Sequence, residues 1–281
     1  MASKRRVSGK VVAITGGARG IGLATARALV LQGAKVAIGD LDGALAKEVA
    51  AGLGGHAVGT DLDVTDRDSF AAFLDYAVAE LGPLDVLVNN AGIMPLGAVV
   101  AESDSVARRI VDVNVHGVIT GTKLAAAHML PRHSGHIVNV SSGVGRVALP
   151  GAATYSATKH AVVGFSEATR AELRPSGVDV SVVLPLIVNT ELGSGVHAVR
   201  GQRTVEASEV AEAIVGVITK PRFETWVPRS GGRLYRFMFL MPRAWSEALG
   251  RAVGAADALS NTDAGARQAY EARARREVDD R

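Results

Sequence analysis

Cysteine is absent from this 281-residue chain, which excludes a disulfide framework, a thiolate metal site and a cysteine nucleophile. Long apolar runs are missing as well, because no stretch approaches the roughly 20 residues that span a bilayer. The apolar run after the basic N-terminus is only Val11–Ile14, too short for the core of a signal peptide. The seven histidines show no spacing typical of metal ligands, so we expect no metal. These absences favour a cytoplasmic protein.

Charge of one sign is scarce too. The formal net charge is +3, and the excess lies in residues 221–281, which hold 11 Lys+Arg and 8 Asp+Glu. The two signs are interleaved there, which favours a solvated helical surface over a nucleic-acid interface. With 48% hydrophobic and 21% charged residues, the composition is that of a folded globular chain.

Apolar β-branched runs alternate with helical patterns along residues 1–228. Several runs lack polar alternation, as strands covered on both faces do. We therefore expect an α/β fold: one doubly wound, Rossmann-type parallel sheet of about seven strands, with helices on both faces. The expected strands are Val11–Thr15, Lys35–Asp40, His56–Asp61, Val86–Asn89, His136–Ser141, Asp179–Leu184 and Thr225–Pro228. The expected helices include Ile21–Gln32, Ser69–Leu81, Val106–Met129 and Tyr155–Leu173.

The last segment, residues 229–281, has a different pattern. A dense apolar run, Tyr235–Met241, ends at Pro242, and small and apolar residues then recur every four positions beside charged ones. This predicts an amphipathic helix that begins near Pro242, and the charged end 271–281 is expected to fray. We expect a helical extension packed on the same domain or at an oligomer interface. Its three possible roles are to close the substrate cavity, to form a subunit interface, or to lie peripherally on a membrane.

A glycine-rich turn follows the first expected strand and opens the first helix. Glycines there let the backbone approach a pyrophosphate, and the helix N-terminus supplies free N–H groups. Asp40 ends the second strand, where a carboxylate accepts hydrogen bonds from an adenosine ribose and repels a 2′-phosphate. NAD is therefore the expected cofactor, although Arg19 in the turn can reach a 2′-phosphate and leaves NADP open. The turn reads Thr15-Gly16-Gly17-Ala18-Arg19-Gly20-Ile21-Gly22.

Several motifs, in order along residues 8–228, resemble the short-chain dehydrogenase/reductase family. The glycine turn has that family's Thr-Gly-x-x-x-Gly-x-Gly form, and Tyr155 and Lys159 match its Tyr-x-x-x-Lys motif. The remaining matches are Asp63-Val64, Asn89-Asn90-Ala91-Gly92, Val113-Asn114-Val115 and Ser141-Ser142. One position departs from the pattern, since Leu186 follows Pro185 where the family usually has glycine. The added bulk near the nicotinamide predicts a different turn there.

The resemblance implies a set of site residues. The implied catalytic residues are Asn114, Ser142, Tyr155 and Lys159. The implied cofactor-binding residues are Gly16, Arg19, Gly20, Ile21, Gly22, Asp40, Asp63, Val64, Asn90, Ala91, Gly92, Tyr155, Lys159, Pro185, Val188 and Thr190.

Tyr155 is the expected proton-transfer residue. A tyrosine with its ordinary pKa of about 10 is a poor base at neutral pH, but Lys159 projects from the same helix face and its ammonium lowers the phenol's pKa. Tyr155 would be the base in oxidation and the acid in reduction. By resemblance, Ser142 orients the substrate oxygen, with Ser141 as the alternative, and Asn114 supports a water chain. Taken alone, the Tyr–Lys spacing also suits an ordinary helix-surface pair.

The substrate region has no cluster of basic residues, so a phosphate-bearing substrate is not expected. Its mostly apolar positions predict a lipophilic alcohol or ketone, although the same residues could simply pack the core. A mobile lid is expected over Glu191–Ala207, as this fold often has. The candidate substrate residues are Met94, Val144, Leu149, Leu186 and Leu192.

The leading hypothesis is thus an NAD(H)-dependent oxidoreductase that acts on a small lipophilic molecule. The resemblance also implies a homodimer or homotetramer that associates through the long helices Val106–Met129 and Tyr155–Leu173. An epimerase or dehydratase on the same scaffold is one alternative, because such enzymes often keep the Tyr–Lys pair. A nucleotide-sensing protein that has lost its chemistry is another. A sensor needs the glycine turn but not the proton relay, and the complete relay argues against it.

Overall fold

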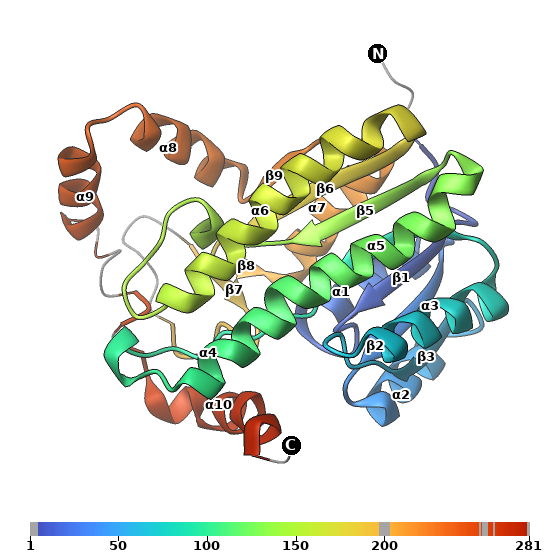
Figure 1. Ribbon diagram of the computed structural model, residues 1–281, viewed down its shortest axis with the longest axis horizontal. Helices are drawn as coiled ribbons and strands as arrows, with labels where there is room; N and C mark the ends of the chain where they lie inside the picture. The colour runs from blue at the N-terminus through green and yellow to red at the C-terminus, as the bar shows by residue number, and fades with distance from the viewer. Residues whose placement is uncertain (1–4, 197–202, 253, 255–257, 261, 280–281) are drawn as a thin grey trace.

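A seven-stranded parallel sheet forms the centre of the computed structural model, which describes residues 5–196, 203–252, 254, 258–260 and 262–279 (Figure 1). The strand order β3-β2-β1-β4-β5-β6-β9 confirms the predicted fold class. The strands are β1 (Val11–Thr15), β2 (Lys35–Asp40), β3 (Ala57–Asp61), β4 (Leu84–Asn89), β5 (Gly135–Val140), β6 (Val178–Pro185) and β9 (Glu224–Val227). A separate short pair joins β7 (Val188–Asn189) to β8 (Val205–Glu206).

The order of the sheet reverses at β1, which pairs with β2 on one side and with β4 on the other. Chains leaving the carboxyl ends of β1 and β4 therefore diverge, and an open α/β sheet binds its ligands in the crevice at this point. The glycine turn after β1 and the Asn89–Gly92 segment after β4 both lie at that crevice. The topology thus brings two motifs together that are about seventy residues apart in the sequence.

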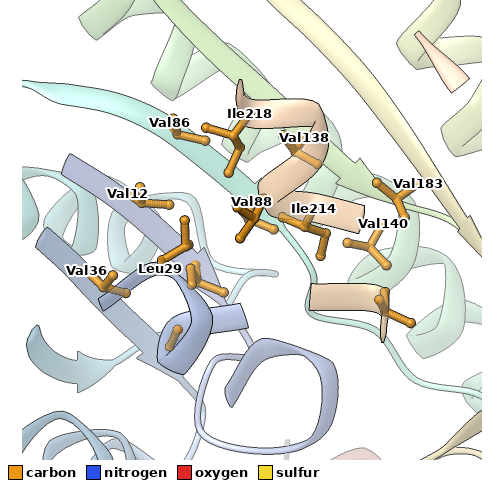
Figure 2. Close-up of a cluster of buried hydrophobic side chains, with 14 of the residues drawn as sticks. Val12, Leu29, Val36, Val86, Val88, Val138, Val140, Val183, Ile214 and Ile218 are labelled. Carbon is orange, nitrogen blue, oxygen red and sulfur yellow. The ribbon is translucent and has the colours of Figure 1, made fainter. Parts of the chain in front are cut away.

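Helices cover both faces of the sheet. On one face, α1 (Gly20–Val30), α2 (Gly43–Leu53) and α7 (Ala207–Thr219) bury a valine- and isoleucine-rich core against the strands, as Figure 2 shows for Leu29, Ile214 and their neighbours. On the other face, α3 (Arg67–Leu81) and α5 (Gly117–Met129) pack against the same strands around Phe70 and Phe73. The longest helix, α6 (Ala153–Leu173), packs against β6.

The single long helix expected over Val106–Met129 is interrupted in the structure. Helix α4 (Asp104–Val111) leads into a π-helical stretch, Asp112–His116, before α5 begins. Asn114 lies in the middle of this stretch, and π-helical turns are frequent at functional sites. The apolar spacing that predicted one helix is kept on both sides, so it carried no sign of the widened turn.

The C-terminal segment forms three helices, α8 (Arg229–Phe239), α9 (Arg243–Ala252) and α10 (Ala264–Asp279). The predicted helix after Pro242 corresponds to α9, but the apolar run before it is the second half of α8. Residues 271–279, where fraying is expected, belong to α10, which continues to Asp279, and an ion pair between Arg267 and Glu271 spans one of its turns. In Figure 1, α8 and α9 extend from one end of the sheet, whereas α10 lies beside α4. Among the described residues, no helix is long and apolar enough to cross a membrane.

Candidate active site

One cavity of about 750 Å³ opens at the carboxyl ends of the strands. All the residues proposed for the site line it, with two exceptions. Gly22 lies beneath the glycine turn, and Asn114 lies behind the wall of the cavity. The structure therefore brings together the predicted cofactor, catalytic and substrate residues in one continuous space.

The glycine turn forms one end of this cavity. Gly16 and Gly20 have φ angles of +62° and +52°, a backbone conformation that side chains disfavour. A Cβ atom on Gly22 would lie 2.2 Å from the carbonyl oxygen of Gly16, so only glycine fits there. The side-chain nitrogen of Asn90 donates to the carbonyl oxygens of Thr15 and Gly16 at 3.0 and 2.9 Å. The amide thus holds the turn in shape, a structural role beside its expected cofactor contact.

Two acidic residues control the charge beside the turn. Asp40 accepts hydrogen bonds from the backbone N–H groups of Ala18, at 3.0 Å, and Asp42, at 3.2 Å. Its carboxylate is therefore oriented at the cavity wall. The Arg19 guanidinium is paired with Asp42 at 2.9 Å. The pKa of Asp42 is lowered first by the Leu45 backbone N–H and then by Arg19. Arg19 thus carries its own counterion.

Tyr155 and Lys159 lie one turn apart on α6 and face the cavity. The Lys159 Nζ is 5.6 Å from the centroid of the Tyr155 ring and donates to the Val140 carbonyl oxygen at 3.1 Å. Burial raises the pKa of Tyr155 to about 12, opposed by a hydrogen bond with Ser142. Burial also lowers the pKa of Lys159 to about 8. Desolvation is therefore the main influence on the pKa of this phenol, and the opposing influence comes from Ser142 rather than from the ammonium.

The serine doublet after β5 divides into two roles. The Ser141 hydroxyl is buried and donates to the Lys159 carbonyl oxygen at 2.9 Å, so it ties α6 to the sheet. The Ser142 hydroxyl lies at the cavity, hydrogen-bonded with the Tyr155 phenol. It also accepts from the Val144 backbone N–H at 3.3 Å. This geometry favours Ser142 over Ser141 as the residue that meets a substrate oxygen.

Asn114 is fully buried and joins the π-helical stretch to the loop after β4. Its Oδ1 accepts from the Ile93 N–H at 2.9 Å, and its Nδ2 donates to the Ile93 carbonyl oxygen at 2.9 Å and to the Thr158 hydroxyl at 3.2 Å. Thr158 in turn donates to the Tyr155 carbonyl oxygen at 2.7 Å. Asn114 therefore connects the cavity loop to the helix that carries Tyr155 and Lys159.

The other end of the cavity is apolar. Four of the five candidate substrate residues pack with Tyr155 in one hydrophobic cluster. The fifth, Leu186, packs with Trp226 and Tyr235 instead, and its backbone N–H pairs with the Val227 carbonyl oxygen at 2.9 Å. Leu186 thus extends the pairing of β6 with β9, and its side chain fills the space beside Gly143 and Gly231. The predicted lid is described at Glu191–Val196 and again from 203, while 197–202 lie outside the described residues.

Helix α10 contributes residues that the sequence patterns did not single out. Tyr270 lines the cavity and accepts a hydrogen bond from the Met94 backbone N–H at 2.6 Å. Arg267 is 2% exposed and bonds to backbone oxygens of both loops that flank the cavity. The one available signal was the spacing of Arg267 and Glu271, which is also the spacing of ordinary surface ion pairs on helices.

Comparisons with known proteins agree with this geometry. A family model described as short chain dehydrogenase matches residues 10–200. A 3-alpha-(or 20-beta)-hydroxysteroid dehydrogenase of Mycobacterium bovis is 41% identical over 187 residues, which is 66% of this chain and 72% of that protein. A cis-4-hydroxycyclohexanecarboxylate dehydrogenase of Sinomonas cyclohexanicum is 41% identical over 217 residues, which is 75% of this chain and 84% of that protein.

Solved structures show the same arrangement of elements. A short chain dehydrogenase/reductase from Burkholderia phymatum, in complex with NAD, superposes with a TM-score of 0.77 at 26% identity. The match covers 91% of this chain and 99% of that one.

Proposed function

The chain belongs to the short-chain dehydrogenase family, and from this membership we propose an NAD(H)-dependent oxidoreductase that interconverts a lipophilic secondary alcohol and its ketone. Tyr155 is its general acid and base. The observation that carries the proposal is one cavity with a dinucleotide-type glycine turn at one end and Tyr155, Lys159 and Ser142 in the middle. The names of the relatives favour a dehydrogenase over an epimerase, a dehydratase or a sensor.

The residues at the glycine turn fit a dinucleotide. Gly22 leaves no space for a side chain beneath the turn, so the backbone can approach a pyrophosphate closely. Asp40 is held where it can accept from a ribose, and Val188 and Thr190 are proposed to hold the carboxamide. Asp40 and the pairing of Arg19 with Asp42 favour NAD over NADP, because a 2′-phosphate would meet two carboxylates. When bound, NAD supplies the hydride acceptor.

The catalytic residues handle the proton. With its pKa raised to about 12, Tyr155 is protonated at neutral pH, and Lys159 remains mostly an ammonium because pH 7 lies below its pKa of about 8. This state is ready to donate a proton to a carbonyl oxygen held by Ser142. In the oxidation direction Tyr155 must first lose its proton, so the rate of oxidation rises with pH.

The substrate class follows from the apolar end of the cavity. Met94, Val144, Leu149 and Leu192 surround Tyr155 there, which suits a hydrocarbon skeleton that bears the reacting oxygen. We also propose that residues 229–281 form an extension of the same domain, since α10 lines the cavity. We propose a homodimer or homotetramer that associates through α4, α5 and α6, and we favour this assembly over a peripheral membrane contact of the C-terminal segment.

The Tyr155→Phe variant tests the assignment. Removing the hydroxyl is expected to lower kcat about a thousandfold while NAD still binds. Turnover is measured by the absorbance of the reduced cofactor over a panel of cyclic and steroid alcohols, and binding is measured by titration with NAD. Tyr76→Phe, which changes a tyrosine on α3 away from the cavity, is the matched control. Substantial turnover by Tyr155→Phe would exclude Tyr155 as the proton-transfer residue. No turnover of any alcohol by the unmodified chain would contradict the proposed function.

A further inference from the structure

Two phenols besides Tyr155 line the cavity: Tyr235 of α8, which stacks on Trp226 beside Leu186, and Tyr270, which lies near the apolar cluster around Tyr155. Tyr270 comes from α10, more than a hundred residues after Tyr155, and both line the same space. The Tyr270 Oη accepts a hydrogen bond from the Met94 backbone N–H at 2.6 Å, and Met94 itself belongs to the apolar cluster around Tyr155. The Tyr270 hydroxyl is thus fixed at the cavity wall, close to the place where the substrate skeleton is expected.

This hydroxyl keeps a proton to donate. A phenol has one O–H donor besides its acceptor lone pairs, and the Met94 bond uses only a lone pair. Burial raises the pKa of Tyr270 above its ordinary value, so the proton stays on the oxygen at working pH. Among the described residues no hydrogen bond takes up this proton, and the partly buried side chain lines the cavity, where a tyrosine hydroxyl can meet a polar partner. A ligand in the cavity can provide the acceptor.

Arg267 holds Tyr270 in place. The guanidinium lies 5.2 Å from the Tyr270 ring, and its Nη2 donates to the Met94 carbonyl oxygen at 2.8 Å. Its Nη1 donates to the carbonyl oxygens of Leu192 and Ser194 at 3.0 and 2.9 Å. Arg267 therefore fastens α10 to both loops that border the substrate end, and Tyr270 cannot shift without moving them.

The same contacts exclude an anionic ligand group at this place. Arg267 has five N–H donors: two bond to the Glu271 carboxylate, through Nε and Nη2 at 3.2 Å, and three to backbone oxygens. Its charge is balanced by Glu271 and its donors are taken, so it offers nothing to a carboxylate or phosphate. Arg273, nearer the opening, is paired with Glu191 at 2.5 Å.

We propose that Tyr270 forms a second polar subsite in the cavity, which donates a hydrogen bond to a neutral oxygen of the substrate other than the reacting one. The inference rests on the proposed alcohol–ketone chemistry and narrows its substrate class. The substrate is a lipophilic molecule with two separate oxygens: the alcohol or ketone at Tyr155, and a carbonyl, ether or hydroxyl oxygen at Tyr270.

The test compares methoxycyclohexanols with ethylcyclohexanols of the same ring positions, so that each pair differs by an oxygen in place of a methylene. The unmodified enzyme with NAD is expected to prefer the best ether by about tenfold in kcat/KM, because the ethyl group leaves the Tyr270 proton without an acceptor. In Tyr270→Phe this ratio is expected to fall to about one, while Tyr76→Phe keeps it. Using a ratio within each variant removes any general loss of activity. A cyclohexanol that carries a carboxylate at the same ring position is not expected to be preferred over the ethyl compound.

Three results would overturn the subsite: no preference for any ether in the unmodified enzyme, an unchanged ratio in Tyr270→Phe, or a carboxylate preferred over the ether. If no alcohol is oxidised, the proposed function fails separately, and the subsite is then judged by titrating the corresponding methoxy and ethyl ketones. The same tenfold difference in Kd, lost in Tyr270→Phe, would support the subsite without the reaction. Equal Kd values would overturn it.

Arg267→Lys tests the positioning role. Lysine keeps the charge but cannot reproduce the five fixed donors, so Tyr270 loses its support while keeping its hydroxyl. We expect KM for the ether to rise several-fold with little change in kcat, and the ether preference to shrink. A fall in kcat for ether and ethyl compounds alike, with the preference intact, would show that Arg267 only stabilises the fold.

Discussion

The two ends of the cavity are built in different ways. The cofactor end depends on one short turn, Gly16–Gly22, supported by Asn90 and Asp40 at the ends of neighbouring strands. The substrate end is assembled from the loops after β4 and β5, the segment after β7, α8 and α10. The side chain of Arg267 fastens the loop after β4 and the segment after β7 to α10. The turn is shaped by local backbone geometry, whereas the substrate end depends on side-chain contacts across 173 and 75 residues of sequence.

The difference shows how a shared fold can serve different substrates. The cofactor end has almost no freedom, because a Cβ at Gly22 would meet backbone. The lining of the substrate end can be altered by substitutions in α10, which lies outside the sheet. If the proposed substrate site is correct, substitutions at the α10 residues that line the cavity are expected to change specificity while leaving the glycine turn intact.

The largest expected effect concerns the buried charge between the two ends. Burial lowers the pKa of Lys159 from 10.5 to about 8, so between these pH values the unfolded state binds more protons and stability rises with pH. The free energy of unfolding is expected to rise by about 3 kcal/mol from pH 8 to 10.5 because of this lysine. Above pH 10 the raised pKa of Tyr155 acts with the opposite sign, since the unfolded chain loses that proton first.

Urea unfolding of the unmodified chain and Lys159→Met from pH 7 to 10 isolates the contribution of Lys159, because all other groups are common to both. If burial lowers the pKa of Lys159, the free energy of unfolding rises more steeply with pH in the unmodified chain than in Lys159→Met. If the free energy of unfolding changes with pH in parallel for the two proteins, Lys159 is well solvated. The middle of the cavity would then be filled with water.

Much of the cofactor end could be predicted from the sequence. The glycine turn, Asp40 and the Tyr155–Lys159 spacing are contained in short segments, and each strand that carries them was recognisable from its β-branched run. The order of the strands then placed these segments at one crevice. The choice of Ser142 over Ser141 came from the resemblance to the family, and the hydrogen bonds of the two hydroxyls favour it.

The substrate end could not be predicted in the same way. Arg267 belongs to a helix rich in arginine and glutamate, and such a pattern normally means a solvated surface, so the charged end was expected to fray. Its burial arises from loops that lie far away in the sequence. The raised pKa of Tyr155 could not be predicted for a related reason: spacing reveals a neighbouring ammonium, but it does not reveal how completely the phenol is shielded from water.

Cofactor preference sharpens the comparison at the cofactor end. Asp40→Ala removes the carboxylate that is proposed to accept from the ribose, so we expect kcat/KM with NAD to fall about tenfold and activity with NADP to rise. Asp61→Ala is the matched control, because Asp61 pairs with Asp40 in register on the neighbouring strand and does not line the cavity. Initial rates with both cofactors measure the effect. An unchanged NAD-to-NADP ratio in Asp40→Ala would assign the preference to Arg19 and Asp42.

The smallest effect is expected on the exposed side of α8, the first helix of the C-terminal segment. Phe237 and Leu240 are 61% and 84% exposed, in contrast to Arg267, and neither lines the cavity. Phe237→Ser is therefore expected to change the free energy of unfolding by less than about 0.5 kcal/mol and to leave kcat/KM unchanged. Leu31→Ser, at an exposed position after α1, is the control, and Tm is measured at several protein concentrations. If the Tm of the unmodified chain rises with concentration and Phe237→Ser abolishes that rise, this side of α8 is buried in an assembly. The substrate end would then depend on a second copy of the chain as well as on α10.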